Sequence, residues 1–121
     1  MEPEETRSTS SGRLAAVSAE EFFKVDLRVG KVEEAILLDN SDKLIRLIVD
    51  FQAEKRTILA GLKPFFDPDF FLGKMFVFAY NLAPRKMAGM ISQGMMLCAD
   101  NESGPKPLAA PEGSREGDKL R

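Results

Sequence analysis

The sequence predicts an all-β domain, a small barrel of five short strands with a short helix between the third and fourth strands. Three observations lead to this prediction. Apolar residues alternate or cluster in five segments of strand length, turn-forming residues separate these segments, and one helix signal follows the third segment. At 121 residues, the chain is expected to form a single domain that can bury a sizeable core.

The start of the chain differs in composition from the rest. Residues 1–19 are rich in Glu, Ser and Thr, which predicts a flexible acidic tail, and the folded domain is expected over residues 20–121. At this boundary Ser18 and Glu21 have the spacing of a helix-capping pair. A short helical start is therefore expected before the first strand.

The first three strands are expected within residues 25–60. The first covers residues 25–38, where apolar and polar residues alternate until Gly30, so a bulge or sharp bend is expected at this glycine. A turn at 39–42 leads to the second strand, residues 44–51. That strand presents one apolar face, made of Ile45, Leu47, Val49 and Phe51. The third strand, residues 55–60, follows a short turn.

The helix and the last strands follow. Asp67 as N-cap, Pro68 at the first helical position and Gly73 just past the end predict the short helix. Residues 74–80 form the fourth strand, which is apolar on both faces and therefore central. A long loop over 81–94 precedes a fifth strand at 95–99. A last strand edge is expected near residues 119–120.

This order of elements fits an OB-fold, a partly open five-stranded barrel; SH3-like barrels and β-sandwich fragments are alternatives. An OB-fold binds its ligands on the face of strands 2 and 3 and between two loops, named L12 and L45 after the strands that they join. In this chain L12 is residues 38–43 and L45 is residues 81–94.

The composition argues against an enzyme. The chain has no histidine and one cysteine, which removes histidine-based acid–base catalysis, histidine-activated nucleophiles, the usual zinc sites and any internal disulfide. Acidic side chains do not cluster at metal-ligand spacing, so neither a metal site nor another cofactor is expected. The sequence shows no signal peptide and no membrane-spanning run, so a cytoplasmic protein without membrane contact is expected.

The charges are unevenly distributed along the chain. The net charge is −2, yet residues 70–99 contain Lys74, Arg85 and Lys86 and no acid at all. Acidic side chains beside these cations would weaken the positive field that attracts phosphate groups. The absence of acids from L45 therefore favours a phosphate-facing loop.

Several stretches in order resemble a known family: VDLRVGKV, NSDKLIRLIVD, KRTILAGLKPFF, GKMFVFAYNLAPRKMAGMISQGMML and PEGSREGDKL. Over roughly residues 20–121 the chain is similar to the tRNA-binding domain at the C-terminus of methionyl-tRNA synthetases and to free-standing structure-specific tRNA-binding proteins. The resemblance implies an OB-fold that binds tRNA by its shape. It also implies a homodimer, or a module that raises the tRNA affinity of a synthetase. Many relatives carry His-Pro where this chain has Leu38 and Asp39.

The resemblance and the cation pattern together give eight candidate RNA-binding residues. They are Arg28, Lys31, Lys43, Asn81, Arg85, Lys86, Ser92 and Met95. Six of them have structural alternatives that the sequence leaves open: an ion pair between Arg28 and Asp26, a solvated loop for Arg85 and Lys86, a backbone turn at Asn81 and at Ser92, and a core position for Met95. No catalytic residue is expected.

The sequence therefore predicts a non-catalytic tRNA-binding module that is part of, or a partner to, a methionyl-tRNA synthetase catalytic chain. It would recognise tRNA shape and backbone, and it would form a homodimer. The alternative is a homodimerisation or protein-interaction module, similar to an export chaperone, with little RNA affinity.

Overall fold

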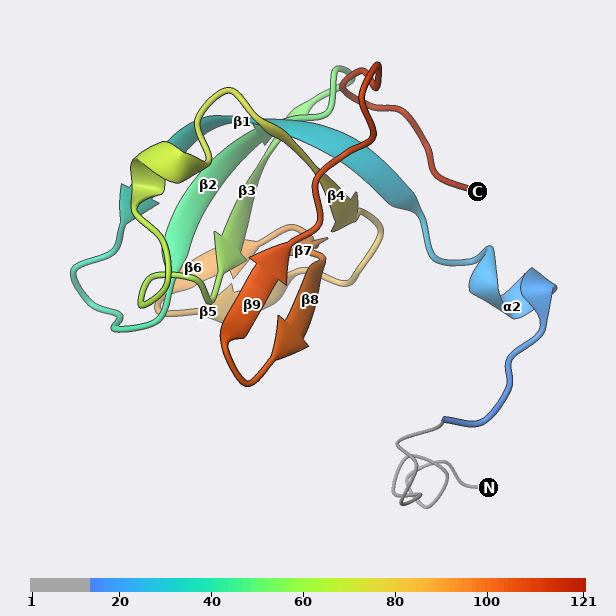
Figure 1. Cartoon of the computed structure of the whole chain (residues 1–121), viewed down its shortest axis with the longest axis horizontal. Helices are drawn as coiled ribbons and strands as arrows, with labels where there is room; N and C mark the ends of the chain where they lie inside the picture. Colours follow the sequence, from blue (N-terminus) through green and yellow to red (C-terminus); the bar gives the residue numbers. More distant parts are fainter. Residues whose placement is uncertain (1–13) are drawn as a thin grey trace.

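The centre of the structure is a curled, five-stranded antiparallel sheet (Figure 1). The computed structural model describes residues 14–121. The strand order is β3-β2-β1-β4-β7, with β1 at Leu27–Leu37, β2 at Ile45–Asp50, β3 at Lys55–Ala60, β4 at Met75–Ala79 and β7 at Met95–Met96. The sheet forms an OB-like half-barrel, which confirms the predicted fold class.

Strand β1 is shared by the two sides of the sheet. Its first half, from Leu27 to Lys31, pairs with β4, and the part from Lys31 to Leu37 pairs with β2. The sequence predicted a bulge or bend at Gly30, but the register shifts between Val32 and Glu34, so the bulge lies two to four residues further along the strand. Gly30 has a different role: a Cβ atom there would lie 2.4 Å from Cγ1 of Val49. Only glycine fits without displacing the core.

The core lies on the concave side of the sheet. In β2 the exposure alternates as predicted, and Ile45, Leu47 and Val49 are completely buried. Four of the five residues of β4 are also buried, as expected for a central strand. Each fully buried side chain of this size contributes about 1.5–3 kcal/mol to folding, so these two strands hold the barrel together.

The helical segments are short. Between β3 and β4 the predicted helix is a single 3-10 turn, η1 at Pro68–Phe70, and the α-helix that the structure describes is α2 at Ala19–Phe22, before β1. Ser18 caps α2 as predicted, because its Oγ accepts a hydrogen bond from the backbone N–H of Glu21 at 3.0 Å. No helix within residues 14–121 is long and apolar enough to cross a membrane.

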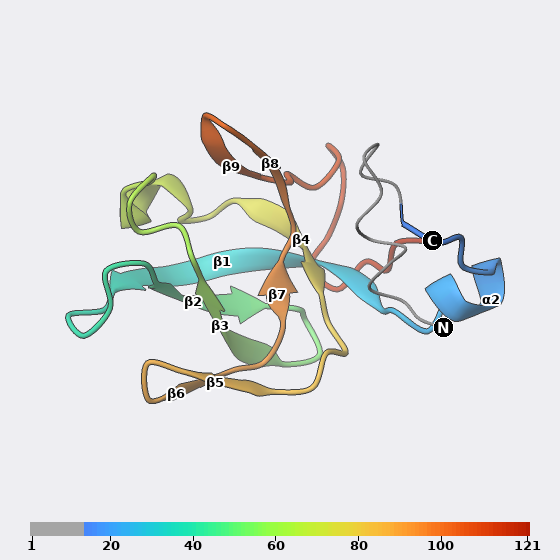
Figure 2. The same cartoon turned by 90° about the horizontal axis from the view of Figure 1, so that it is seen from below.

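Helix α2 extends away from the barrel (Figures 1 and 2) and contains no buried residue. It begins at Ala19, close to the predicted start of the domain. Residues 1–13 of the predicted tail lie outside the described residues. The tail and its boundary therefore stay a prediction.

Two hairpins are absent from the sequence prediction. The predicted L45 loop contains β5 (Arg85–Met87) paired with β6 (Met90–Ser92), and the predicted fifth strand ends after β7. Residues from Cys98 instead form β8 (Cys98–Asn101), which pairs with β9 (Gly104–Pro107). Figure 2 shows the two hairpins on opposite sides of the molecule. Near the C-terminus, Lys119 bridges to Arg28 of β1, so the predicted last edge is confirmed.

Candidate nucleic-acid interface

Side chains close the barrel between β3 and the β5–β6 hairpin. The backbone N–H of Gln93 donates to the carbonyl of Thr57 at 2.9 Å, and the Gln93 amide oxygen accepts from the Thr57 N–H at 3.1 Å. Two residues further along β3, the N–H of Leu59 donates to the Ser92 hydroxyl at 2.9 Å. These bonds replace a strand ladder and hold the hairpin against β3.

Ser92 is an internal residue of this seam. It is 3% exposed, and besides accepting from Leu59 its hydroxyl donates to the carbonyl of Gly94 at 3.0 Å. The single hydroxyl proton is therefore used inside the protein. The geometry favours the structural alternative for Ser92, and we do not include its side chain in the proposed RNA contacts.

Asn81 fastens the N-terminal segment to the end of β4. Its amide oxygen accepts from the N–H of Asp26 at 2.8 Å, and its NH₂ group donates to the carbonyl of Lys24 at 2.7 Å. The side chain thus provides hydrogen-bond partners for backbone groups of Lys24 and Asp26, which come just before β1. Both polar groups of the Asn81 amide are therefore bound to backbone groups of the N-terminal segment.

Arg28 belongs to a cluster of charged and aromatic groups around Tyr80. Its guanidinium binds Asp26 through Nε at 3.0 Å and Nη2 at 2.9 Å, and it lies 4.1 Å from the centre of the Tyr80 ring. The hydrogen bond from Arg28 holds the pKa of the Asp26 carboxyl below its ordinary value. The ion pair that the sequence left open is therefore formed.

Arg56 lies over the same ring at 3.5 Å and connects three segments. It forms an ion pair with Glu54 at 2.8 Å and donates to the carbonyls of Tyr80 and Gln93, the residues that bracket the segment 81–92. The pKa of the Tyr80 phenol is raised, mainly because the side chain is buried and also because its hydroxyl donates to the Glu54 carboxylate. Arg56 is not a sequence candidate, because nothing local indicates that its partners lie across the barrel.

Arg85 and Lys86 are the exposed cations of the hairpin. Within residues 14–121 neither side chain has a hydrogen-bond or ion-pair partner, and both are exposed. Arg85 is opposite Ser92 and Lys86 is opposite Ile91 in the ladder. Since neighbouring residues of a strand point to opposite faces, Arg85 faces β3 and Lys86 faces outward.

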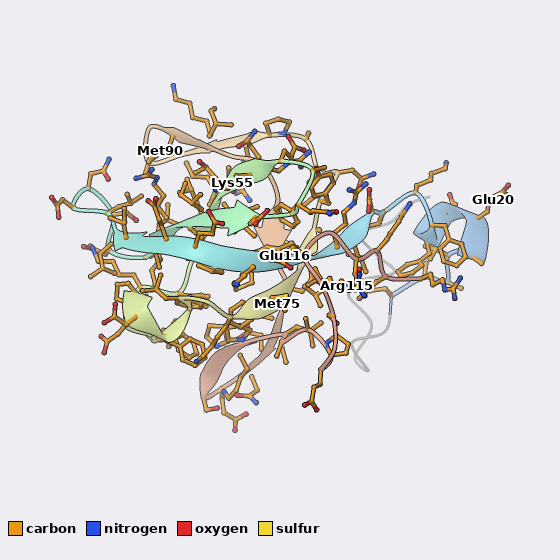
Figure 3. The ribbon with its side chains drawn as sticks, turned by 90° about the horizontal axis from the view of Figure 1, so that it is seen from above. Glu20, Lys55, Met75, Met90, Arg115 and Glu116 are labelled. Atoms are coloured by element: carbon orange, nitrogen blue, oxygen red, sulfur yellow. The ribbon has the colours of Figure 1, made fainter. Side chains whose placement is uncertain are left out.

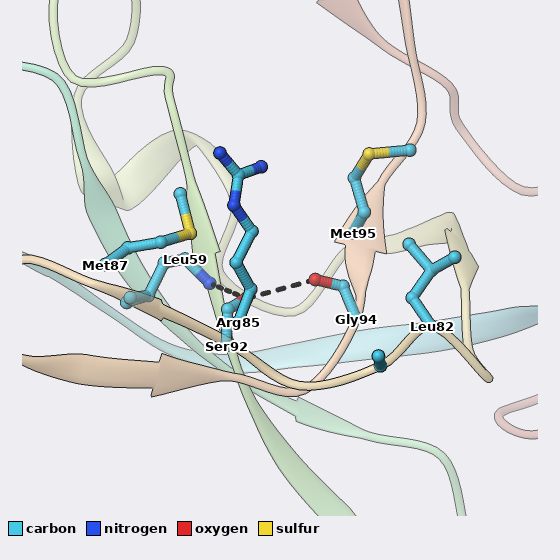
Figure 4. A pocket seen from close by; sticks show the side chains of 8 residues that line it. Leu59, Leu82, Arg85, Met87, Ser92, Gly94 and Met95 are labelled. Carbon is cyan, nitrogen blue, oxygen red and sulfur yellow. Dashed lines mark hydrogen bonds between the residues drawn. The ribbon is translucent and has the colours of Figure 1, made fainter.

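The inner face of the hairpin contains a small pocket (Figure 4). It has a volume of about 100 Å³ and is lined by Leu59, Leu82, Ala83, Arg85, Met87, Ser92, Gly94 and Met95. In Figure 4 the guanidinium of Arg85 lies between the thioethers of Met87 and Met95. Leu82 lies on the Met95 side of the pocket, away from Met87 (Figure 4). Met95 is 48% exposed. Its side chain is therefore outside the core, whereas the neighbouring Met96 is buried.

Loop L12 touches the tip of this hairpin. The Asn40 side chain donates to the carbonyl of Ala88 at 3.1 Å. On the other side of the loop, the Lys63 ammonium donates to the carbonyls of Leu38 at 2.7 Å and Ser41 at 2.6 Å. Lys43 is exposed in this fixed loop. The two loops that the OB-fold assigns to ligands are thus in contact.

The structure brings together only part of the predicted set. Arg85 and Lys86 lie on the β5–β6 hairpin, Met95 lies at the start of β7 and lines the same pocket as Arg85, and Lys43 lies in the adjoining loop L12. Lys31 is half-buried in the middle of β1, away from this unit. Leu82 and Met87 are absent from the predicted set, although apolar residues in a segment expected to be a loop were a signal for them.

Comparison with known proteins identifies the family. Residues 27–119 match the family model described as "Putative tRNA binding domain". The chain belongs to this tRNA-binding domain family. Among curated relatives, it is 40% identical over 121 residues to the methionine–tRNA ligase of Nitrosospira multiformis and 46% identical over 91 residues to that of Thermotoga maritima. These matches cover 98% and 75% of this chain but 17% and 14% of the ligases.

Solved structures agree with this assignment. A MetRS-related protein from Pyrococcus horikoshii superimposes with a TM-score of 0.84 and 37% identity, over 89% of this chain and all of the other. A CsaA chaperone protein from Picrophilus torridus superimposes with a TM-score of 0.80 and 25% identity, over 88% of this chain and all of the other. The same domain thus occurs in proteins of the domain's own size and within much longer ligases.

Proposed function

We propose that this chain is a non-catalytic module that binds tRNA through the unit formed by the β5–β6 hairpin and loop L12. The single observation that carries the proposal is the pair Arg85 and Lys86. Both are exposed, both are without a partner within the described residues, and they lie in a thirty-residue stretch free of acids. Phosphates supply most of the affinity of proteins for nucleic acids, and unpaired cations meet them without first breaking an ion pair.

The fixed geometry of the unit supports recognition of tRNA by shape. Ser92, Gln93 and Arg56 hold the hairpin against the barrel, and Asn40 connects its tip to L12. A rigid surface selects a backbone contour with a smaller loss of entropy than a mobile loop would incur. Lys43 is the cation that we propose for the L12 side.

A methionyl-tRNA synthetase catalytic chain is the partner that we propose for this module. The similarity to ligases over a small fraction of their length supports a domain that adds tRNA affinity to chemistry performed elsewhere. Such a module works where tRNA is charged, so the proposal places it in the cytoplasm.

We further propose that two copies of the chain associate through the segment 14–25. Leu14, Val17, Phe22 and Phe23 are between 47% and 65% exposed. Phe23, Val25 and Leu120 line a hollow of about 310 Å³ beside them. Several large apolar side chains exposed within one short segment are typical of an interaction site, and we propose that the same segment of a second copy, related by a twofold axis, covers them.

The second candidate function is a protein-interaction module with little RNA affinity. The similarity to a CsaA chaperone protein favours it, as does the same exposed apolar segment. The two functions differ in whether the chain binds tRNA, and the first also requires that this binding depends on Arg85 and Lys86.

The test is a salt titration of tRNA binding with a double charge reversal, Arg85→Glu/Lys86→Glu. Loss of two phosphate contacts should weaken binding by roughly tenfold or more, and it should reduce the slope of log K against log salt by about two. Fluorescence anisotropy of labelled tRNA at several salt concentrations measures both quantities.

The matched control is Lys106→Glu/Arg115→Glu, which makes the same change in net charge on exposed residues of β9 and the C-terminal segment. Figure 3 shows Arg115 far from Met90 of the hairpin. If the control weakens binding as much as the hairpin variant, or if the hairpin variant keeps the wild-type slope, the interface is wrong. A wild-type chain that ignores tRNA at low salt favours the second function.

A further inference from the structure

The pocket on the inner face of the hairpin combines properties that phosphate contact alone does not require. Besides Arg85, its accessible lining is apolar: Leu82, Met87 and Met95 project into it or over its rim (Figure 4). Leu82 and Met95 remain 42% and 48% exposed. Apolar side chains that surround an unpaired cation contribute nothing to the attraction of a phosphate group, and their exposure to water is unfavourable.

From these contacts we infer that the pocket receives one unpaired nucleobase of the bound RNA, while Arg85 reaches the adjoining phosphate or stacks on the base. This inference rests on the proposed function and deepens it. RNA-binding proteins recognise unpaired bases by placing them against flat or apolar side chains and against guanidinium planes. A thioether adapts its shape to such a surface, and two of them flank the guanidinium here.

The polar groups of the pocket limit what it can recognise. The Ser92 hydroxyl proton is bound to the Gly94 carbonyl, and the Leu59 N–H is bound to the Ser92 oxygen. Among the side chains that line the pocket, the remaining donor is the Arg85 guanidinium. The side chains of the pocket therefore offer no set of fixed donors and acceptors for reading a base edge, and the pocket should accept different bases with similar affinity.

Charge decides between RNA and an apolar peptide as the occupant. The stretch from Phe70 to Ala99 contains cations and no acid, and Lys86 extends from the outer face of the same strand. A ligand that offers an apolar flat group beside a negative charge is complementary to this surface. A nucleotide has both.

The experiment compares two single-stranded probes, oligouridylate and a stable abasic sugar–phosphate chain with the same number of phosphates. The wild-type chain should bind the probe with bases about five- to tenfold more tightly, which corresponds to the lower end of the energy of one stacked base. In Leu82→Ala/Met95→Ala this ratio should fall to about one. In Met95→Leu, which keeps an apolar contact, it should persist.

Ile91→Ala is the matched control, because Ile91 is 49% exposed on the same hairpin but points outward and does not line the pocket. It should keep the wild-type ratio. Equal binding of both probes by the wild type, an unchanged ratio in the double variant, or the same loss in the control would each overturn the inference. Unfolding midpoints of all variants show whether the hairpin stays folded.

These failures can be told apart from failure of the proposed function. Arg85→Glu/Lys86→Glu weakens both probes through their phosphates and lowers the salt slope, whether or not a base enters the pocket. If both probes bind equally but remain sensitive to this charge reversal, phosphate binding stands and the base site does not. A supporting result requires both a ratio above one and its loss in the pocket variant.

Discussion

At the edge of the barrel, hydrogen bonds from single side chains take the place of the backbone hydrogen bonds that would join two strands. Ser92, Gln93 and Arg56 each bind backbone groups that belong to a different segment of the chain. Buried backbone N–H groups without a partner are costly, so a side chain that supplies the partner determines where two segments meet. The position of the hairpin, and therefore of Arg85, depends on these few contacts.

Ser92→Ala tests this at the residue scale. The substitution leaves the buried N–H of Leu59 without an acceptor, so the free energy of unfolding should fall by about 1–3 kcal/mol. Affinity for tRNA, measured well below the unfolding midpoint, should fall far less than in Arg85→Glu/Lys86→Glu, because Gln93 and Arg56 still hold the hairpin against the barrel. The control Ser103→Ala removes an exposed hydroxyl and should change stability by at most about 0.5 kcal/mol. A large loss of affinity with unchanged stability would restore Ser92 as an RNA contact.

At the scale of one element, the β5–β6 hairpin is held in a conformation that its sequence does not favour. The residues at its turn, Ala88 and Gly89, both have positive φ angles, of 50° and 78°. Two-residue hairpin turns of this kind prefer Asn-Gly or Asp-Gly, because alanine in the left-handed region is strained. The hydrogen bond from Asn40 to the Ala88 carbonyl compensates part of that cost.

Ala88→Asn should therefore stabilise the hairpin by roughly 0.5–1 kcal/mol, a part of the strain at this residue. Because three-residue strands open locally, amide hydrogen exchange across β5 and β6 is the appropriate measurement. The hairpin amides should become more protected. In the control, Ala53→Asn, an exposed alanine that is not among the positive-φ residues is replaced, and protection should not change. Faster exchange in Ala88→Asn would contradict the argument.

At the scale of the whole molecule, the proposed RNA surface and the proposed dimer surface lie at different places. The hairpin unit closes the barrel against β3, whereas α2 and the segment before it extend from the start of β1 (Figures 1 and 2). Two copies joined through residues 14–25 would therefore keep both hairpin units free. Such a dimer could contact one tRNA at two points, which raises affinity through effective concentration.

Phe22→Ser/Phe23→Ser should convert the dimer to a monomer, because it removes the two aromatic rings from a segment with no buried residue of its own. Light scattering gives the mass directly. The barrel should unfold at nearly the wild-type temperature, since neither ring is part of its core. The control is Leu108→Ser, which replaces a 46% exposed leucine outside the segment 14–25 and should leave the mass of the particle in solution unchanged. A monomeric wild type, or a double variant with wild-type mass, would contradict the proposed dimer.

The alternation of apolar residues by itself determined the strands of the barrel. Residues such as Ile45, Leu47 and Val49 are separated by one residue each, and a strand is the conformation that buries all three on one face. The cap at Ser18 and the acid-free stretch around Arg85 are local features as well, so they were visible without the fold. The family motifs are short stretches of consecutive residues, so they too could be recognised from the sequence alone.

The tertiary structure decided which of the candidate residues are free. Asn81 and Ser92 are occupied by partners that lie 55 and 33 residues away in the sequence, and the two hairpins have short strands without a clear alternation. Hydrogen bonds across the barrel leave no local pattern, because they depend on where the closed sheet places its edges. For the same reason the pocket beside Arg85, which brings Leu82, Met87 and Met95 together, follows only from the folded chain.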